Sequence, residues 1–312
     1  MVIYIRILVY GAGVLGCNLA HALWISHKDV TLLARGNWYE EIKNNGMTIR
    51  HKLFAGKKTN DRLPVINELK EQDYYDVVFV VMQCTQIDSI LPILQQNVSR
   101  NIVLVGNNIY ADKYAKELAD KEVLFAFFSA GGQKKGNVIE SFNKNNMTMG
   151  RIDGTDQSDD FIKNIFEGTK IKVTIENKMN DWLKSHVAFI MPFVALAYYS
   201  NCDYKNIRHN NTLINQCIDA VKENYDALVK LGYEVLPESD YLMVSSRRIE
   251  AYLFIKLCCY TILGDLCVCD HARNRMHEMI YLNEQLKTLK RKSKMETKLS
   301  DELDQYFPTN ES

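Results

Sequence analysis

The residues with the clearest chemical meaning lie near the N-terminus, where three glycines are spaced as G-x-G-x-x-G: Gly11, Ala12, Gly13, Val14, Leu15 and Gly16. In such a motif the first glycine allows a tight turn, the second lets backbone amides approach a pyrophosphate, and the third lets a helix pack close to a strand. The apolar residues 5–10 before the motif predict a strand, and residues 13–24 predict a helix whose N-terminus would face the phosphates. In this context the motif predicts dinucleotide binding; a tight turn without a ligand is the alternative.

An arginine stands at the end of the next predicted strand, residues 30–33. Enzymes that use NAD usually place Asp or Glu there to bind the ribose 2′-hydroxyl. This chain has no acidic residue at positions 32–37, and the Arg35 guanidinium is suited to pair with a 2′-phosphate. A solvated side chain is the simpler alternative for Arg35. The combination predicts NADP (NADPH) rather than NAD as the cofactor.

The first part of the chain alternates short β-rich runs with helical patterns, which is typical of βαβ units on a parallel sheet. Further strands are expected at residues 76–82, 102–105, 123–128 and 171–175, with a hairpin at the sheet edge made from 138–141 and 147–150. The fold class predicted for the whole chain is α/β, with an N-terminal Rossmann dinucleotide-binding domain at 1–175 followed by an all-α C-terminal domain at 176–312.

The second part has apolar residues at spacings of three and four, which indicate amphipathic helices. One helix contains Trp182 and Ala197, and the next runs to Leu231 with Gly232 as its C-cap. Two more helices are expected at residues 251–263 and 277–290. The polar tail after Lys290 predicts a frayed helix and then disorder, and the basic run at 287–294 predicts a solvated helix surface.

Composition excludes several classes of partner. Lys and Arg together number 38, as do Asp and Glu, so no surplus of positive charge points to nucleic acid. No run of about 18–20 apolar residues indicates a membrane helix, and Arg6 interrupts the apolar N-terminus. Eight cysteines are scattered through the 312 residues, which favours reduced thiols in a cytoplasmic protein.

Several stretches together resemble the ketopantoate reductase (2-dehydropantoate 2-reductase) family, from residue 5 to about residue 289. They are the glycine motif, VTLLAR at 30–35, VGNN at 105–108, GNVI at 136–139, WLK at 182–184, NIRH at 206–209 and HEMIYLN at 277–283. The resemblance implies an NADPH-dependent reduction of 2-dehydropantoate to pantoate, on the route to pantothenate and coenzyme A.

The resemblance also implies roles for individual residues. Lys184 matches the family's acid catalyst, Glu278 the acid that binds a substrate hydroxyl, and Asn107 the asparagine between cofactor and substrate. Gln83 stands after the third expected strand, at the cofactor, where the family has a lysine. A lysine suits this chemistry because hydride arriving at a ketone carbon leaves negative charge on the oxygen, which an ammonium group stabilises and protonates.

Besides Gln83, three positions depart from the family pattern. Ala188 and Pro192 stand four and eight residues after Lys184, where the family has asparagines, and Leu266 replaces a substrate-binding serine. Three functions therefore stay open: a reductase of a small 2-oxo acid, a family paralogue that reduces another carbonyl substrate, and a non-catalytic NADPH-binding protein. A homodimer is the assembly expected for this chain.

Two other groups of residues have simpler explanations than chemistry. Cys267, Cys269 and His271 could bind a metal, but a structural zinc site would need a second pair of ligands, for which Cys258 and Cys259 are the only candidates. Buried core thiols are preferred, and no metal is predicted. His186 follows Lys184 by two residues, which puts it on another helix face, as a core or interface residue.

Overall fold

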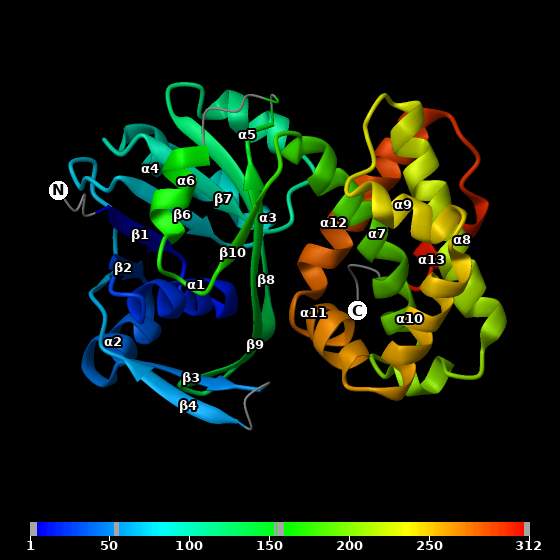
Figure 1. Ribbon diagram of the computed structural model, residues 1–312, viewed down its shortest axis with the longest axis horizontal. Coiled ribbons are helices and arrows are strands. Elements are labelled where there is room, and N and C mark those ends of the chain that lie inside the picture. Colours follow the sequence, from blue (N-terminus) through cyan, green and yellow to red (C-terminus); the bar gives the residue numbers. More distant parts are fainter. Residues whose placement is uncertain (1–4, 53–55, 153, 155–158, 309–312) are drawn as a thin grey trace. The chain divides into compact units, whose positions relative to one another are not determined.

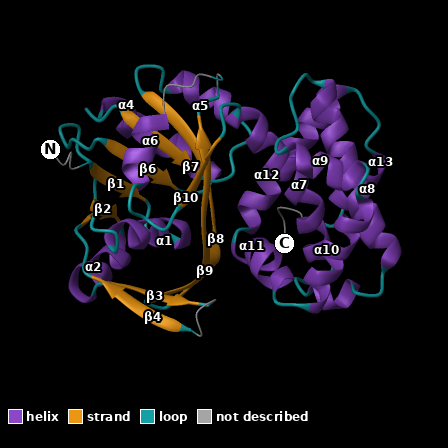
Figure 2. Cartoon of the chain, in the orientation of Figure 1, coloured by secondary structure: helices purple, strands orange, loops and turns teal. Residues whose placement is uncertain are grey.

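The computed structural model describes residues 5–52, 56–152, 154 and 159–308. The chain divides into two compact units, Met1–Met179 and Asn180–Ser312. The first unit is a sheet with helices and the second is helical (Figures 1 and 2), which confirms the predicted fold class. Within the described residues, no helix combines the length and apolar character needed to cross a membrane.

The strands of the described chain form a single sheet in the order β4-β3-β9-β8-β7-β6-β1-β2-β5, with β10 paired to β9. They are β1 (Arg6–Tyr10), β2 (Asp29–Leu33), β3 (Met47–His51), β4 (Lys57–Asp61), β5 (Val65–Ile66), β6 (Val77–Val81), β7 (Asn101–Val105), β8 (Glu122–Lys135), β9 (Val138–Gly150) and β10 (Lys172–Ile175). The run β5-β2-β1-β6-β7-β8 is parallel throughout. Successive strands are added on one side of β1 as far as β5 and on its other side from β6 to β8. This strand order is that of the Rossmann fold.

The central strands are apolar on both faces because helices cover both. All five residues of β6 are buried. On one face Phe79 packs edge-to-face against Phe166 at 5.9 Å between ring centroids, in a core that also contains Leu19 of the first helix. The helices of this unit are α1 (Val14–Trp24), α2 (Gly36–Asn45), α3 (Cys84–Ile87), α4 (Leu91–Gln96), α5 (Ala111–Glu117) and α6 (Asp159–Phe166).

The edge of the sheet differs from the sequence prediction. Residues 138–150 do not form a hairpin of their own: they are the single strand β9, which pairs with β8 in a long antiparallel hairpin. The polar residues in the middle of β9 resemble a turn in sequence, and Asn145 there adopts φ 54°. The strand nevertheless continues, because a register shift between Phe128 and Ala130 on β8 accommodates the irregular backbone. Strands β3, β4 and β5 were not predicted from the sequence, because they are short or polar.

The second unit consists of helices α7 (Met179–Tyr199), α8 (Asn211–Lys230), α9 (Glu238–Ser245), α10 (Arg248–Tyr260), α11 (Asp270–Asn274), α12 (Met276–Ser293) and α13 (Lys298–Asp304). Gly232 follows α8 with φ 89°, as expected for a residue that ends a helix. The helix predicted at 251–263 ends earlier, at Tyr260, where Thr261 turns to an extended conformation.

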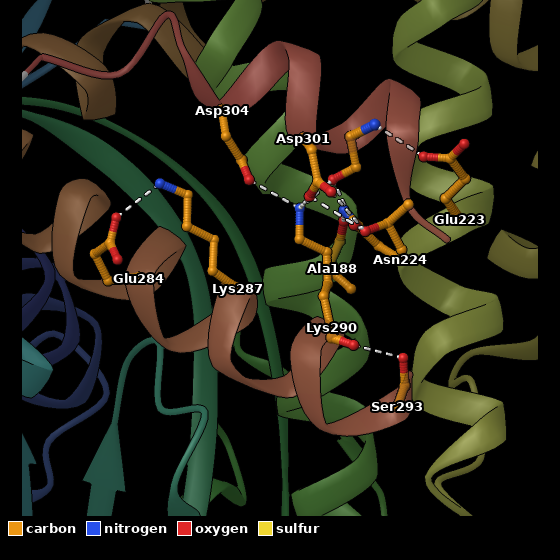
Figure 3. Close-up of polar contacts among 11 residues, drawn as sticks. Ala188, Glu223, Asn224, Glu284, Lys287, Lys290, Ser293, Asp301 and Asp304 are labelled. Carbon is orange, nitrogen blue, oxygen red and sulfur yellow. Dashed lines mark hydrogen bonds and ion pairs between the residues drawn. The ribbon is translucent and has the colours of Figure 1, made fainter. Parts of the chain in front are cut away.

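The prediction of a frayed tail after Lys290 is wrong. Helix α12 continues to Ser293, and α13 then packs against α8. Lys290 is buried rather than solvated, with its Nζ 2.7 Å from Asp301 Oδ1 and 2.8 Å from Asp304 Oδ2 (Figure 3). The two carboxylates lie in α13, so a charge that looks solvated in sequence is paired by a later segment. Residues 309–312 lie outside the described part.

A series of hydrogen bonds connects α13 to α7 through α8. Pro192 lies inside α7 and has no N–H for the carbonyl of Ala188, four residues earlier. Asn224 of α8 supplies the missing donor: its Nδ2 lies 3.0 Å from Ala188 O (Figure 3). Asn224 Oδ1 accepts from Ser300 Oγ at 2.7 Å, and Ser300 Oγ accepts from Lys290 Nζ at 2.8 Å. The buried amide thus satisfies groups of two other helices.

Candidate functional site

The glycine motif forms the turn between β1 and α1. Gly11 has φ 122°, and a Cβ there would lie 2.3 Å from Val81 O. A Cβ on Gly16 would lie 1.8 Å from Gly11 O. Both distances are far below van der Waals contact, so the backbone packing of β1, β6 and α1 requires glycine at these two positions.

Gly13 has a different environment. It is exposed, with φ −77° and ψ −171°, and it is the N-cap of α1 without a side chain to cap the helix. The N–H groups of the first turn, which begins with Val14 and Leu15, are the ones that a helix leaves without carbonyl partners. The first turn of α1 also carries no acidic residue. The helix terminus is therefore suited to an anion, as the motif predicts.

Arg35 is placed beside this turn. It is the N-cap of α2, its side chain is exposed, and its guanidinium donates to the Tyr10 hydroxyl. The guanidinium carbon also lies 5.5 Å from the centroid of the Tyr10 ring. Tyr10 is the last residue of β1, so the ring holds Arg35 near Gly11. Among the described ion pairs none involves Arg35, which leaves its charge without a carboxylate.

Three residues that sequence reasoning did not assign to the site also lie in this region. Trp38, in the first turn of α2, donates from Nε1 to Ala12 O at 2.8 Å, and the Cys17 thiol donates to the same carbonyl at 3.4 Å. Lys134 Nζ lies 3.8 Å from the centroid of the Trp38 ring. Trp38 follows Arg35 by three residues, a spacing that could have indicated it. Lys134 could not be found, because β8 runs past the predicted end of the strand.

The ends of β6 and β7 bring the remaining predicted residues of this unit to the same edge. Tyr10 pairs with Val80, and Val81 pairs with Val105, so the turns that follow β1, β6 and β7 are neighbours. Gln83 lies after β6 as the N-cap of α3, and Gly106 and Asn107 follow β7. Asn107 Oδ1 is buried and has no hydrogen-bond partner within the described residues. Buried amide oxygens are normally paired, so this atom is available to a ligand.

Lys184 and Glu278 lie in the second unit, and both are buried. Lys184 is in the second turn of α7, where its Nζ donates to Asn180 Oδ1 and lies 4.9 Å from the centroid of the Tyr233 ring. Glu278 is in the first turn of α12. A fully buried lysine is rare unless it is paired or functional, so the burial itself distinguishes Lys184 from a solvated helix charge.

The three departing positions in the second unit are buried apolar residues. Ala188 is fully buried, Pro192 is buried in the same helix, and Leu266 is buried in the π-helical turn η3 (Asp265–Cys269). His186 stacks on Trp182 at 5.1 Å between ring centroids and 7° between ring planes. Burial lowers the pKa of His186 to about 4, with a smaller effect from His271. His186 is therefore neutral near pH 7 and is not an acid at that pH.

The cysteines weighed as metal ligands are core residues where the structure describes them. Cys258, Cys259 and Cys269 are buried and form no disulfide, and burial raises the pKa of Cys259 and raises that of Cys269 to about 12. Such thiols stay protonated, whereas zinc binds the thiolate. The described residues contain no group of three or more His, Cys, Asp or Glu side chains arranged for a metal ion.

The sheet order and the glycine turn define the first unit as a Rossmann domain, here combined with a helical second unit. The resemblance to the ketopantoate reductases, a family of oxidoreductases, is confirmed: residues 7–154 match the family model described as ketopantoate reductase PanE/ApbA. No curated protein sequence matches the chain.

Solved structures share the fold over nearly the whole chain. A 2-dehydropantoate 2-reductase from Geobacter metallireducens GS-15 has a TM-score of 0.76 and 13% identity, over 97% of this chain and 98% of that one. A D-mandelate dehydrogenase, described with NADH and anilino(oxo)acetate, has a TM-score of 0.76 and 16% identity, over 97% and 96%. A ketopantoate reductase from Staphylococcus aureus, described as dimeric, has a TM-score of 0.71 and 14% identity, over 97% of both chains. At such identities the similarity establishes the fold.

Proposed function

We propose that this chain is an NADPH-dependent reductase of a small 2-oxo acid. The observation that carries the proposal is the grouping at one edge of the sheet: the glycine turn, the unpaired charge of Arg35 and the unpartnered Oδ1 of Asn107. The N-terminus of α1 suits the pyrophosphate, Arg35 suits a 2′-phosphate, and Asn107 suits an amide or hydroxyl donor of the cofactor or substrate.

Within this proposal, the glycine turn and Arg35 would hold a nicotinamide cofactor, which would supply hydride for the carbonyl carbon of the substrate. Lys184 stabilises the charge that develops on the carbonyl oxygen and gives it a proton, so that the product is a 2-hydroxy acid. Lys184 then recovers a proton from water. Glu278 binds a polar group of the substrate, and Asn180 and Tyr233 hold the lysine in place.

The substrate need not be 2-dehydropantoate. Ala188, Pro192 and Leu266 are apolar where the family has polar side chains, so fewer polar groups are left to bind a polar substituent, which favours a 2-oxo acid with an apolar substituent. The D-mandelate dehydrogenase relative is described with anilino(oxo)acetate, an aryl 2-oxo acid derivative. We therefore propose, as second candidate, a paralogue that reduces a more apolar carbonyl compound. The proposal extends to assembly: the S. aureus relative is described as dimeric, and we propose that this chain also pairs with a second copy.

The test is an assay of NADPH oxidation against 2-oxo acids with hydroxyalkyl, branched alkyl and aryl substituents, with 2-dehydropantoate among them. Turnover with any of them, faster with NADPH than with NADH, is the expected result. Turnover confined to apolar substituents would favour the second candidate. Tight NADPH binding without turnover on the whole panel would support the non-catalytic alternative and overturn the proposed activity.

A further inference from the structure

Helix α10, drawn in yellow to orange in Figure 1, carries a row of exposed apolar side chains. Ile249, Leu253 and Leu257 follow one another at intervals of four residues and so lie on one face. Tyr260 continues this row, while Phe254, one position after Leu253, and Ile262, just beyond the end of the helix, border it. The six side chains, here called the α10 stripe, are between 38% and 75% exposed. The opposite face of α10 is buried in the second unit through Ala251, Ile255, Cys258 and Cys259. The helix is thus apolar on two sides, with only one side covered.

Each charged residue of α10 has a polar partner within its own chain. Glu250 pairs with Arg247 at 3.2 Å, and Arg248 pairs with Asp219. Lys256 Nζ donates to the carbonyl of Arg208 and, at 2.8 Å, to Asn211 Oδ1. In a two-fold symmetric contact, residues near the axis meet their own copies, so an unpaired charge would face a like charge. The stripe avoids that repulsion.

The size of the exposed apolar area also fits a second copy of this chain as the binding partner. Six large side chains at these exposures present on the order of 600 Å² of apolar surface. That is at or above about 300–600 Å², the largest patch on a typical monomer, and close to the roughly 800 Å² per partner of a stable interface. We infer that the α10 stripe is the contact through which two copies of this chain pair, with the two α10 helices packed face to face and Leu253 near the axis. The inference rests on the proposed homodimer.

Analytical ultracentrifugation of the full chain between about 1 and 100 μM would test it. The unmodified protein should sediment at twice its 36.0 kDa chain mass. Leu253→Asp and Leu257→Asp should each weaken the dimer by at least 100-fold, because a charge would meet its own copy or an apolar partner across the contact. Val229→Asp is the matched control, since Val229 is an exposed apolar residue of α8 outside the stripe. Circular dichroism would establish that each variant is folded.

The possible outcomes test the homodimer and the contact surface separately. A monomer at 100 μM in the unmodified protein would overturn the homodimer and the stripe together. A dimer that survives both α10 substitutions would overturn the stripe alone. A dimer that Val229→Asp weakens as much as Leu253→Asp does would also overturn the stripe. Each of these results leaves the proposed reductase activity untouched.

A second inference follows from an independent observation, the position of Lys134 over Trp38. Arg35 is the N-cap of α2 and Trp38 lies in its first turn, and the Lys134 Nζ lies 3.8 Å from the centroid of the Trp38 ring. Two cations therefore flank the glycine turn, each held by an aromatic ring. We infer that Lys134 is a second binding residue for the 2′-phosphate. This inference rests on the proposed NADPH binding and adds a second residue to Arg35 as a source of the cofactor preference.

Calorimetry with adenosine 2′,5′-bisphosphate and with 5′-AMP isolates this contribution, because the two probes differ only in the 2′-phosphate. A charged hydrogen bond contributes about 10–100-fold in affinity. Lys134→Ala and Arg35→Ala should each reduce the preference for the bisphosphate by that order, and the double variant should reduce it further. Lys135→Ala is the matched control, since Lys135 Nζ pairs with Glu140 at 3.1 Å.

An equal preference in Lys134→Ala and Lys135→Ala would overturn the role of Lys134 and leave Arg35 and the proposed function in place. Failure of the unmodified protein to bind either probe would overturn the proposed function itself.

Discussion

Asn224 donates its side-chain amide to the backbone carbonyl of Ala188 over 3.0 Å, at the one place in α7 where Pro192 removes the helical donor. Asn224→Ala should lower the free energy of unfolding by about 2 kcal/mol, since it leaves a buried carbonyl unpaired. In a Pro192→Ala background the same change should cost about 1 kcal/mol less, because that substitution restores the backbone N–H. Denaturant unfolding of the four proteins measures this coupling. Equal costs in both backgrounds would contradict the compensation.

The carboxylates of Asp301 and Asp304 lie at nearly the same distance from Lys290 Nζ but differ in solvent exposure, so they show how burial changes the strength of an ion pair. The Asp304 side chain is 11% exposed and that of Asp301 is 60% exposed. Asp304→Ala should cost about 2–4 kcal/mol of unfolding free energy, because the buried ammonium loses its sheltered partner. Asp301→Ala should cost less than about 1 kcal/mol, as for other solvent-exposed pairs. Thermal or urea unfolding would measure both. The reverse order of the two costs would mean that the solvated carboxylate is the true partner.

The three glycines of the turn should respond differently to a side chain. Gly13→Val should abolish NADPH binding and leave the fold intact, because Gly13 is exposed and the pyrophosphate would meet the new side chain. Gly16→Val should unfold or strongly destabilise the protein, since its Cβ would lie 1.8 Å from Gly11 O. Calorimetry with NADPH and thermal unfolding separate the two effects. Normal cofactor binding by Gly13→Val would show that the motif is a turn and nothing more.

Lys184 tests whether the second unit takes part in chemistry. Lys184→Ala should reduce kcat by roughly 10²–10⁴-fold, the range of general acid catalysis, with NADPH binding little changed. Glu278→Ala should mainly raise KM if the carboxylate only binds substrate. Steady-state kinetics on the best substrate of the panel provide both numbers. Full activity of Lys184→Ala on that substrate would exclude the lysine as the acid.

His186 should make stability depend on pH. Its pKa in the folded protein is lowered to about 4 by burial, so folding favours the neutral ring. The corresponding stability is present above the unfolded pKa of about 6.5 and is lost as pH falls from there toward 4. His186→Phe should therefore gain on the unmodified protein by about 2 kcal/mol between pH 7 and pH 4.5. Urea unfolding across this range would check it, and a pH-independent difference would show that the ring titrates normally.

Sequence patterns located the residues that stand at the ends of strands. The glycine turn, Arg35 and Asn107 each follow a short apolar run, and parallel strands bring such ends to one edge. Lys134 was missed because β8 extends past its apolar segment, into residues that sequence periodicity does not mark as strand. The pairing of Lys290 was missed for another reason: its partners come from a later helix, and no local pattern records a tertiary ion pair. The exposure of the α10 stripe likewise depends on which side of the helix the rest of the unit covers.

The hydrogen bonds that join Lys290, Ser300 and Asn224 also set the order in which the two units can fold during synthesis on the ribosome. The first unit has all of its described strands once Ile175 has emerged, so its sheet can close while the second unit is still being made. The second unit cannot complete its core until Asp304 has emerged, because Asn224 and Lys290 wait for partners in α13. A nascent chain stalled between α12 and α13 would have a finished first unit and an unfinished second unit, in which Asn224 Oδ1 and the Lys290 ammonium lack their partners in α13, and chaperones would meet this form.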